Sequence, residues 1–514
     1  MDLVKIIQLT LKYNKEHVVV IINFIKPSVR TRGRLNATGD IYRATSAGFP
    51  CVQPGVPPEW VSEDCLTINV YTPNPKASKE NDGKLLPVIF FIHGGSFTFG
   101  QGSTYDGGRL LNKDVVLVTF NYRLGILGFF GFNKENAPGN LAMYDIVHAL
   151  QWVRDYIPYF GGDPNSITIT GQSAGAVAVT HLLVSPMGRG LFHRVISQSG
   201  TALAIWGTAQ NSIEAHLRIA ELSGCYNSSG SHDSSDIDSI VVEKIMECME
   251  IIPHPKLVEV LSTYIAFERR QGRLGFDVIS PTIQSFNASP SFQKFLLEHP
   301  KRVFEEGRQA NVPLLIGVTK NDGSYVFGEF YNYCWKDNKV LNRIRNEYGV
   351  YEFYDFITKN YLENFRKRSS FALLCPVLTD LFSVSFFKAS AYYTALYHSR
   401  ISNETYWYSF DFKGRQTIWS ILFQNELPPF KGGITHGDDL IYLFQFPGIP
   451  FDDDEQVVSN RMVDYWVNFA YYGHLYFSLL LTLIITTAAA TLSDPDIKAA
   501  APSHQSSRSC TMIW

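Results

Sequence analysis

The chain has 514 residues, with a formal net charge of −3 and a pI of about 6.5. Hydrophobic residues make up 45% of it and charged residues 18%, an ordinary globular composition with enough apolar material for a large core. This balance of charge provides no basic face, so we expect no nucleic-acid partner.

The first apolar run of the sequence is VVVIINFI, at residues 18–25, and Lys5, Lys12 and Lys15 precede it. The run is short, contains Asn23 and is not followed by an A-x-A cleavage site, so it would make a poor signal peptide. An ordinary strand is the other interpretation that fits it.

The middle of the chain alternates strand-like and helix-like segments. Continuous apolar runs closed by glycine are typical of buried parallel strands, and they occur at 86–95 and 115–125. Apolar residues at helical spacing predict an amphipathic helix over 140–157. The alternation continues with predicted strands at 165–170, 192–200 and 312–323 and predicted helices at 174–183 and 462–473. This order predicts an α/β fold with a mostly parallel sheet and helices on both faces.

The predicted strand at 165–170 runs directly into GQSAGA, at residues 171–176. A strand, then G-x-S-x-G, then a helix is the context of a nucleophile elbow, in which Ser173 would lie on a sharp turn. Gly171 and Gly175 would leave room for neighbouring backbone. A plain turn between a strand and a helix is the alternative, and the small-residue helix that follows favours the elbow.

A serine nucleophile also needs a base and hydrogen-bond donors for the oxyanion. HGG at 93–95 directly follows a predicted strand, as the oxyanion loop of such enzymes does. We therefore expect the backbone N–H groups of Gly94, Gly95 and Ala174 to face the developing charge. A strand-ending turn without a catalytic role is the alternative for this motif.

The other two members of a catalytic triad are expected downstream of the serine, with the acid before the histidine. Asp322 follows a buried strand, and His436 lies in the glycine-flanked loop GGITHGDDL. An Asx turn before Gly323 would also explain Asp322, and an ordinary surface histidine would explain His436. Chain order and strand-end placement favour the triad Ser173, Asp322 and His436.

Several motifs in a fixed order resemble the type-B carboxylesterase/cholinesterase family, and among them are SEDCLTINVYTP, HGGSF, NYRLGILGFF, GLFHRVISQSG, VPLLIGVTKNDGSY and THGDDLIYLF. The resemblance spans residues 40–474. It implies an α/β-hydrolase fold and carboxylic ester hydrolysis without a cofactor or a metal ion. The family's usual acid is Glu, where Asp322 stands here, and a shorter Asp can serve in the same role.

The resemblance also implies roles for residues around the triad. Ser199 would be a partner of the catalytic acid, and Glu63 and Arg123 would form a buried ion pair. The family's disulfides correspond to Cys51–Cys65 and Cys225–Cys248. Because the chain has seven cysteines, at least one of the other three must then lack an intramolecular partner, and these are Cys334, Cys375 and Cys510.

The residue before the nucleophile is Gln172, where cholinesterases carry a Glu that attracts a cationic substrate. Trp60 stands at an altered spacing from their choline-stacking tryptophan. We therefore expect a neutral small-molecule carboxylic ester as the substrate. GQSAG also resembles insect juvenile-hormone esterases, but the Asp-Gln of that group reads Asp145–Ile146 here, which leaves it a minor option.

Some members of this family are membrane-tethered adhesion proteins that have lost the catalytic serine, and they provide the alternative function. The uncharged stretch 475–492 keeps this alternative open, since it is just long enough to span a bilayer although five of its residues are Ser or Thr. All three triad candidates are present, and this favours the enzyme. The chain is accordingly divided into an atypical N-terminal segment (1–39), a hydrolase domain (40–474) and an atypical tail (475–514).

Sequons and spaced cysteines together favour the secretory pathway, with an extracellular or membrane-attached protein. The glycosylation candidates are Asn36, Asn227 and Asn403, while a fourth sequon at Asn287 is weakened by Pro290.

The N-terminal region looks shortened. Residues 26–35 resemble the family's opening strand, and residues 41–53 resemble the segment before the first disulfide, yet only NATGD lies between them. The family has a long stretch there, beside the active-site mouth. Without that stretch, apolar surface that it covers would be exposed. Each Å² left unburied costs roughly 25 cal/mol of stability, so we expect a less stable fold than that of a complete relative.

Overall fold

The computed structural model describes residues 12–13, 17–23, 47–73, 84–227, 237–271, 273, 275–332, 371–423, 427–475 and 511–513. The sequons and cysteines at Asn36, Cys334 and Cys510 lie outside these residues, as do the shortened region 26–35 and all but Leu475 of the apolar stretch 475–492. Across the described part of the chain, none of the helices combines the length and hydropathy that a membrane crossing requires.

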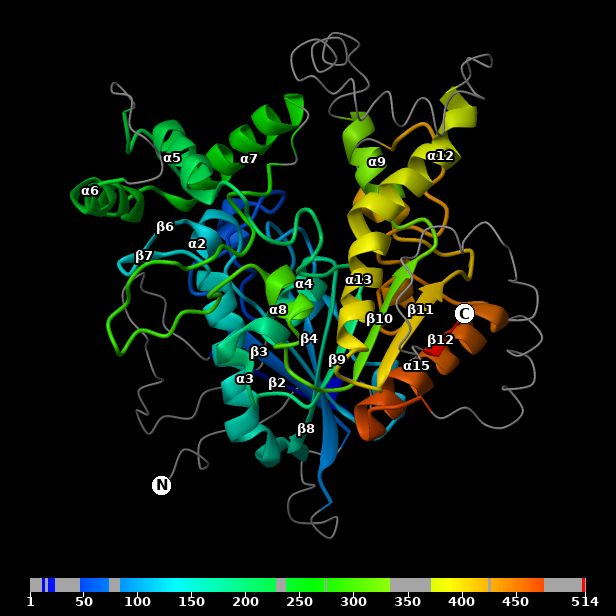
Figure 1. Cartoon of the computed structure of the whole chain (residues 1–514). Helices are drawn as coiled ribbons and strands as arrows, with labels where there is room; N and C mark the ends of the chain where they lie inside the picture. Colours follow the sequence, from blue (N-terminus) through cyan, green and yellow to red (C-terminus); the bar gives the residue numbers. More distant parts are fainter. Residues whose placement is uncertain are drawn as a thin grey trace.

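The described residues form one ten-stranded sheet in the order β1-β2-β3-β5-β4-β8-β9-β10-β11-β12 (Figure 1). All neighbours from β5 to β12 pair in parallel, and the first three strands run antiparallel to their neighbours. The strands are β1 (Lys12–Tyr13), β2 (His17–Asn23), β3 (Thr67–Thr72), β4 (Leu86–Ile92), β5 (Val116–Phe120), β8 (Gly162–Gln172), β9 (Arg194–Gln198), β10 (Leu314–Thr319), β11 (Thr405–Phe410) and β12 (Thr511–Ile513).

Helices surround this sheet, and a small hairpin of β6 (Gly131–Lys134) and β7 (Ala137–Pro138) lies beside it. The helices are α2 (Gly125–Phe129), α3 (Leu141–Tyr156), α4 (Ala174–Val184), α5 (Ser212–Ser223), α6 (Ser239–Glu250), α7 (His254–Arg270), α8 (Pro300–Glu305), α9 (Ser324–Phe330), α12 (Phe371–Ser383), α13 (Ala389–His398), α14 (Trp419–Leu422) and α15 (Asp453–Tyr472). Two shorter helical segments matter for the site, the π-helical η9 (Val384–Lys388) and the 3-10 segment η10 (Asp438–Tyr442).

The two faces of the sheet bury separate apolar clusters because successive side chains of a strand point to opposite sides. In β4, Val88 and Phe90 pack into the cluster that contains α3 and α4. Ile89 and Phe91 pack into the other cluster, which contains α15. Figure 1 shows α3 and α15 on opposite sides of the sheet. The predicted mostly parallel sheet with helices on both faces is therefore confirmed.

Most of the predicted elements occur where the sequence placed them, and the last helix differs at its start. The apolar run at 18–25 is strand β2, paired with β3, which agrees with the strand interpretation. The helix predicted at 462–473 begins earlier, at Asp453, since Asp452 and Glu455 form a reciprocal capping box before a polar first turn. An amphipathic pattern alone does not reveal such a polar start.

Helices α5, α6 and α7 gather at one side of the sheet's upper end in Figure 1, and α9 and α12 lie at the other side of that end. The strands β10 and β11 point toward this end, so these helices surround the carboxyl ends of the parallel strands. The Cys225–Cys248 disulfide joins the turn after α5 to α6. In open α/β sheets, ligands bind at the carboxyl ends of the parallel strands, which is the end that these helices surround.

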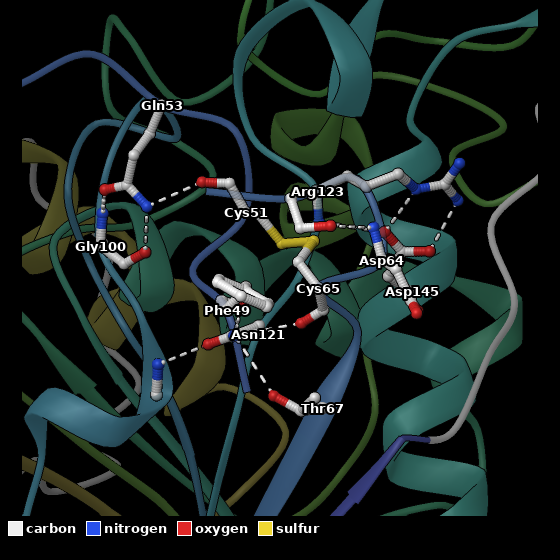
Figure 2. Close-up of a disulfide and its surroundings, with 12 residues drawn as sticks. Phe49, Cys51, Gln53, Asp64, Cys65, Thr67, Gly100, Asn121, Arg123 and Asp145 are labelled. Carbon is white, nitrogen blue, oxygen red and sulfur yellow. Dashed lines mark hydrogen bonds and ion pairs between the residues drawn. A yellow bond between two sulfur atoms is a disulfide. The ribbon is translucent and has the colours of Figure 1, made fainter. Parts of the chain in front are cut away.

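The Cys51–Cys65 disulfide is buried and connects to the loop after β4 through one side chain (Figure 2). The Gln53 amide donates to the Cys51 carbonyl at 2.9 Å and to the Gly100 carbonyl at 3.1 Å, and it accepts the Gly100 N–H at 2.8 Å. On the other half-cystine, Asn121 donates to the Cys65 carbonyl at 3.0 Å. The disulfide thus supports the two loops that follow β4 and β5.

The expected Glu63–Arg123 ion pair is wrong. Glu63 is exposed, and Arg123 instead forms a two-pronged pair with Asp145 of α3, at 2.7 Å from Nε and 2.6 Å from Nη2 (Figure 2). The Asp145 side chain is almost fully buried, so a charge-assisted pair with Arg123 satisfies it. Resemblance transferred the arginine correctly but not its partner.

We expect that replacing Cys51 and Cys65 together by Ser lowers the free energy of unfolding by about 3 kcal/mol. The bridge joins residues at a sequence separation of 14, and closing a loop of that length restricts the unfolded chain by about this free energy. Because Gln53 connects the disulfide to Gly100, the ester hydrolysis that the sequence predicts should also slow at temperatures where the variant is still folded. Urea titration and thermal melts measure the first effect. A matched Cys225→Ser/Cys248→Ser variant should lose stability without the same loss of turnover, and equal turnover losses would contradict the connection.

Burial lowers the pKa of four histidines to about 4, namely His93, His181, His216 and His398. The unfolded value is about 6.5, so the folded state holds fewer protons between pH 6.5 and 4, and stability is lost as the pH falls through that window. In His398→Gln the amide can still donate to the Val312 carbonyl, but the side chain does not titrate. We predict that, when the pH is lowered from 7.5 to 5, the free energy of unfolding of the wild type falls by about 2 kcal/mol more than that of His398→Gln. Urea unfolding at both pH values tests this, and a pH-independent difference would contradict it.

Candidate active site

Ser173 is the single residue between β8, which ends at Gln172, and α4, which begins at Ala174. Its backbone has φ 58° and ψ −122°, a strained conformation for a residue with a side chain. The Ser173 N–H donates to the Gln198 carbonyl at 2.8 Å, and its carbonyl accepts the first bond of the helix from Val177 at 3.0 Å. These bonds hold the turn, and the hydroxyl lies at its tip.

The two glycines of the motif are required by close backbone contacts. A Cβ on Gly171 would lie 2.4 Å from the carbonyl carbon of Gly175, and a Cβ on Gly175 would lie 2.0 Å from the carbonyl oxygen of Ile92. Both distances are below van der Waals contact. The start of α4 therefore lies directly against the ends of β8 and β4.

His436 and Asp322 form a buried hydrogen-bonded pair. The Nδ1 of His436 lies 2.6 Å from Oδ1 of Asp322, whose Oδ2 accepts the Thr319 N–H at 3.1 Å. A carboxylate partner fixes the proton on Nδ1, so Nε2 presents a lone pair. The imidazole packs against the rings of Phe387, at 4.6 Å, and Tyr325, at 5.7 Å between ring centroids.

Ser173 and His436 line the same cavity, and Asp322 lies behind the imidazole. These side chains come from the β8–α4 turn, the loop before η10 and the turn after β10, which are far apart in the sequence. The structure brings together all three residues that the sequence analysis assigned to a triad.

The loop after β4 is unusually tight. Gly95, Ser96 and Phe97 have φ values of 111°, 53° and 57° in succession, and the Thr98 and Phe99 N–H groups both donate to the Gly95 carbonyl. This run of left-handed backbone turns the loop back on itself, so that a Cβ on Gly95 would lie 2.0 Å from the Phe99 carbonyl oxygen.

The backbone that is expected to bind an oxyanion lies beside the serine. A Cβ on Gly94 would lie 3.0 Å from the Ser173 Cβ, so the Gly94 backbone lies close to the Ser173 side chain. Ala174 is the first residue of α4, and the N–H groups of a first helical turn have no acceptor within the helix. The helix dipole adds a partial positive charge at the same point.

His93 supports this loop and is a residue that the sequence analysis named only as part of HGG. Its Nδ1 lies 2.8 Å from the Gly94 carbonyl, and its ring stacks on Tyr122 at 4.4 Å. The Tyr122 hydroxyl donates to the His93 carbonyl at 2.8 Å. Burial lowers the pKa of His93 to about 4, so the ring is neutral and serves as a packing and hydrogen-bonding element.

Ser199 does not make the expected hydrogen bond with the acid. It is fully buried at φ 57°, and its hydroxyl has no hydrogen-bond partner among the described residues. The buried polar group near the triad is instead Asp439, three residues after His436. Asp439 accepts from Gln198 at 2.8 Å and from Tyr408 at 3.1 Å, and burial raises its pKa to about 6.

The walls of the cavity are largely aromatic, and its charged groups are paired. Arg269 of α7 and Glu329 of α9 form an ion pair at 2.7 Å. Arg273 binds both carboxylate oxygens of Glu268, at 2.5 and 2.7 Å. The aromatic lining residues are Trp206, Phe276, Tyr325, Phe330, Phe386 and Phe387. Sequence reasoning missed these walls because they come from helices and loops with no motif of their own.

The chain is similar in sequence to known esterases. The sequence profile of the carboxylesterase family matches residues 36–476. The chain is 32% identical over 444 residues to the juvenile hormone esterase of Tribolium castaneum, covering 80% of this chain and 71% of that protein. It is 31% identical over 433 residues to carboxylesterase 5A of Mus musculus, covering 80% of this chain and 67% of that protein.

Solved structures share the fold. A PNB esterase superposes with a TM-score of 0.67 at 24% identity, covering 91% of this chain and 89% of that chain. The juvenile hormone esterase of Manduca sexta, with OTFP covalently attached, gives a TM-score of 0.64 at 25% identity, covering 85% of this chain and 82% of that chain. These matches confirm the α/β-hydrolase fold. Because the family profile extends over most of its length, the chain belongs to the carboxylesterase family and is a carboxylic ester hydrolase.

Proposed function

We propose that this protein hydrolyses neutral carboxylic esters through an acyl-enzyme formed on Ser173. The observation that carries the proposal is the strained Ser173 turn, which shares one cavity with His436 while His436 is hydrogen-bonded to Asp322.

In the acylation half, the Nε2 of His436 accepts the hydroxyl proton of Ser173 as Oγ attacks the ester carbonyl carbon. The N–H groups of Gly94, Gly95 and Ala174 bind the oxyanion of the tetrahedral intermediate. The intermediate collapses when the bond to the alcohol oxygen breaks, and His436 returns the proton to that oxygen. The alcohol leaves and the acyl group stays on Oγ.

In the deacylation half, water takes the place of the alcohol. His436 accepts a proton from water as its oxygen attacks the acyl carbon, and the same N–H groups bind the second oxyanion. Collapse breaks the bond to Oγ, the proton returns to Ser173, and the carboxylic acid leaves. Asp322 holds the imidazole in one tautomer throughout, and it stabilises the transient imidazolium.

A neutral substrate follows from the charges in the cavity. Gln172 precedes the nucleophile without a charge, and Arg269 and Arg273 each pair with a glutamate. An ionised acyl chain or alcohol would have to displace one of these partners or lie unpaired among aromatic rings, which costs free energy. The aromatic lining favours an apolar ester.

We also place the protein in the secretory pathway. Two disulfides fit an oxidising compartment, and the sequon residues Asn227 and Asn403 are exposed. We propose that both asparagines carry N-linked glycans.

Replacing Ser173 by Ala is expected to lower the turnover of a short-chain nitrophenyl ester by several orders of magnitude, because the acyl-enzyme can no longer form. A fluorophosphonate probe should label the wild type and leave the variant unlabelled. The control is Ser262→Ala, an exposed serine of α7, which should label and turn over like the wild type. Equal turnover by Ser173→Ala would exclude this mechanism, and an unlabelled wild type would favour a binding protein.

Replacing Glu329 by Gln should shift substrate preference toward anionic esters, because Arg269 loses its carboxylate partner in the cavity. We expect the kcat/KM of a nitrophenyl ester with a terminal carboxylate to rise about fivefold, or ~1 kcal/mol, relative to a neutral ester of equal length. The matched control is Glu259→Gln, which removes the exposed Lys256–Glu259 pair on the outside of α7. An unchanged ratio in Glu329→Gln would contradict the charge-pairing argument.

A further inference from the structure

The side chain of Gln172 touches the catalytic base. Gln172 is the last residue of β8, is 5% exposed and directly precedes Ser173. Its Nε2 lies 3.1 Å from the Nε2 of His436, a hydrogen-bond distance between side chains 264 positions apart. The contact is made at the nitrogen that must accept the serine proton.

The direction of this hydrogen bond follows from the protonation of Nδ1, the other ring nitrogen of His436. Asp322 holds the proton of His436 on Nδ1, so Nε2 of the neutral ring is an acceptor. The NH₂ group of the Gln172 amide is a donor and can bond to this lone pair. If the amide were rotated so that its oxygen pointed to Nε2, two acceptors would face each other. Gln172 therefore donates to His436 in the resting enzyme.

The rest of the amide is confined by the backbone on both sides. A Cβ on Gly94 would lie 2.8 Å from the Gln172 Oε1, and a Cβ on Gly437 would lie 3.4 Å from its Nε2. Gln172 thus lies between the oxyanion loop and the loop that carries His436. This placement limits rotation of the amide and keeps its N–H directed at the base.

We propose that Gln172 is a positioning residue that donates to Nε2 of His436 in the resting enzyme, gives up that nitrogen to the Ser173 hydroxyl when an ester binds, and lowers the proton affinity of the imidazole. The inference rests on the proposed function, because it assigns His436 the role of base. A donor at Nε2 stabilises the neutral ring and faces the imidazolium unfavourably. Ester hydrolysis consequently extends to lower pH than it would with an apolar or anionic residue at this position.

Other charged and titratable groups also act on His436. Asp322 contacts the imidazole from the turn after β10, Asp439 interacts electrostatically with it from η10, and Tyr325 stacks on it from α9. The paired Arg269 and Glu329 lie in the same cavity. All of these stay unchanged when only Gln172 is replaced, so a difference between variants reports the amide.

The test compares Gln172→Met, which removes the donor at similar length, with Gln172→Glu, which offers an acceptor to the imidazolium. Histidine labelled with ¹³C at Cε1 is titrated by NMR, and the His436 signal is assigned by its absence in His436→Asn. We expect the titration of His436 to move up by about half a pH unit or more in Gln172→Met and further in Gln172→Glu. The acid limb of kcat/KM for a neutral nitrophenyl ester should move in the same order.

The NMR titration needs no ester turnover, so it separates this inference from the proposed function. Absent turnover with an ordered shift of the His436 titration would remove the function and keep the effect of Gln172 on His436. A merely structural role would change the melting temperature or KM and leave the titration where it is. Coincident titrations of the wild type and Gln172→Met, or a lower value in Gln172→Glu, would overturn the inference.

Discussion

The catalytic centre depends on the contact between the first turn of α4 and the end of β4. Gly175 lies so close to the Ile92 carbonyl oxygen that a Cβ would come within 2.0 Å of it. Ile92 is the last residue of β4 and is paired in register with Gly171 of β8. The serine turn and the oxyanion loop leave neighbouring strands at this one level, so their relative position is set by backbone pairing and by the absence of a side chain.

The remaining parts are added around this contact by hydrogen bonds from the next strands. Ser173 donates to the carbonyl of Gln198 at the end of β9, and the Gln198 side chain in turn donates to Asp439. Asp322, the proposed acid, follows β10, the next strand along, and Asp439 lies three residues after His436. The ends of the adjacent parallel strands β4, β8, β9 and β10 thus contribute to the site in the order of the sheet.

The sequence predicted the parts of the fold that repeat a period or a motif. The apolar runs became β4 and β5, the helical pattern became α3, and G-x-S-x-G after a strand became the turn at Ser173. Those signals are local, since they depend on strand pleating, helix spacing and small residues at a close crossing.

The contacts that the sequence did not reveal join distant residues. The partner of Arg123 is Asp145, and a family resemblance pointed to Glu63 because it transfers roles without showing which carboxylate the backbone brings close. The hydrogen bond from Gln172 to His436 depends on the fold of the whole sheet. Strand β11 was also missed, because its sequence TYWYSF combines aromatic residues with Thr and Ser and lacks the continuous aliphatic run of the other buried strands.

The cavity walls and the catalytic backbone come from different parts of the molecule. The groups proposed to react lie in turns at the ends of sheet strands, where close backbone contacts leave no room for a side chain at Gly171 or Gly175. The walls instead come from α7, α9 and the π-helical segment η9, none of which pairs in the sheet. Divergence of these helices can therefore change the accepted ester over evolutionary time while the machinery of hydrolysis is inherited unaltered, so that kinship in this family is a poor guide to a member's own substrate.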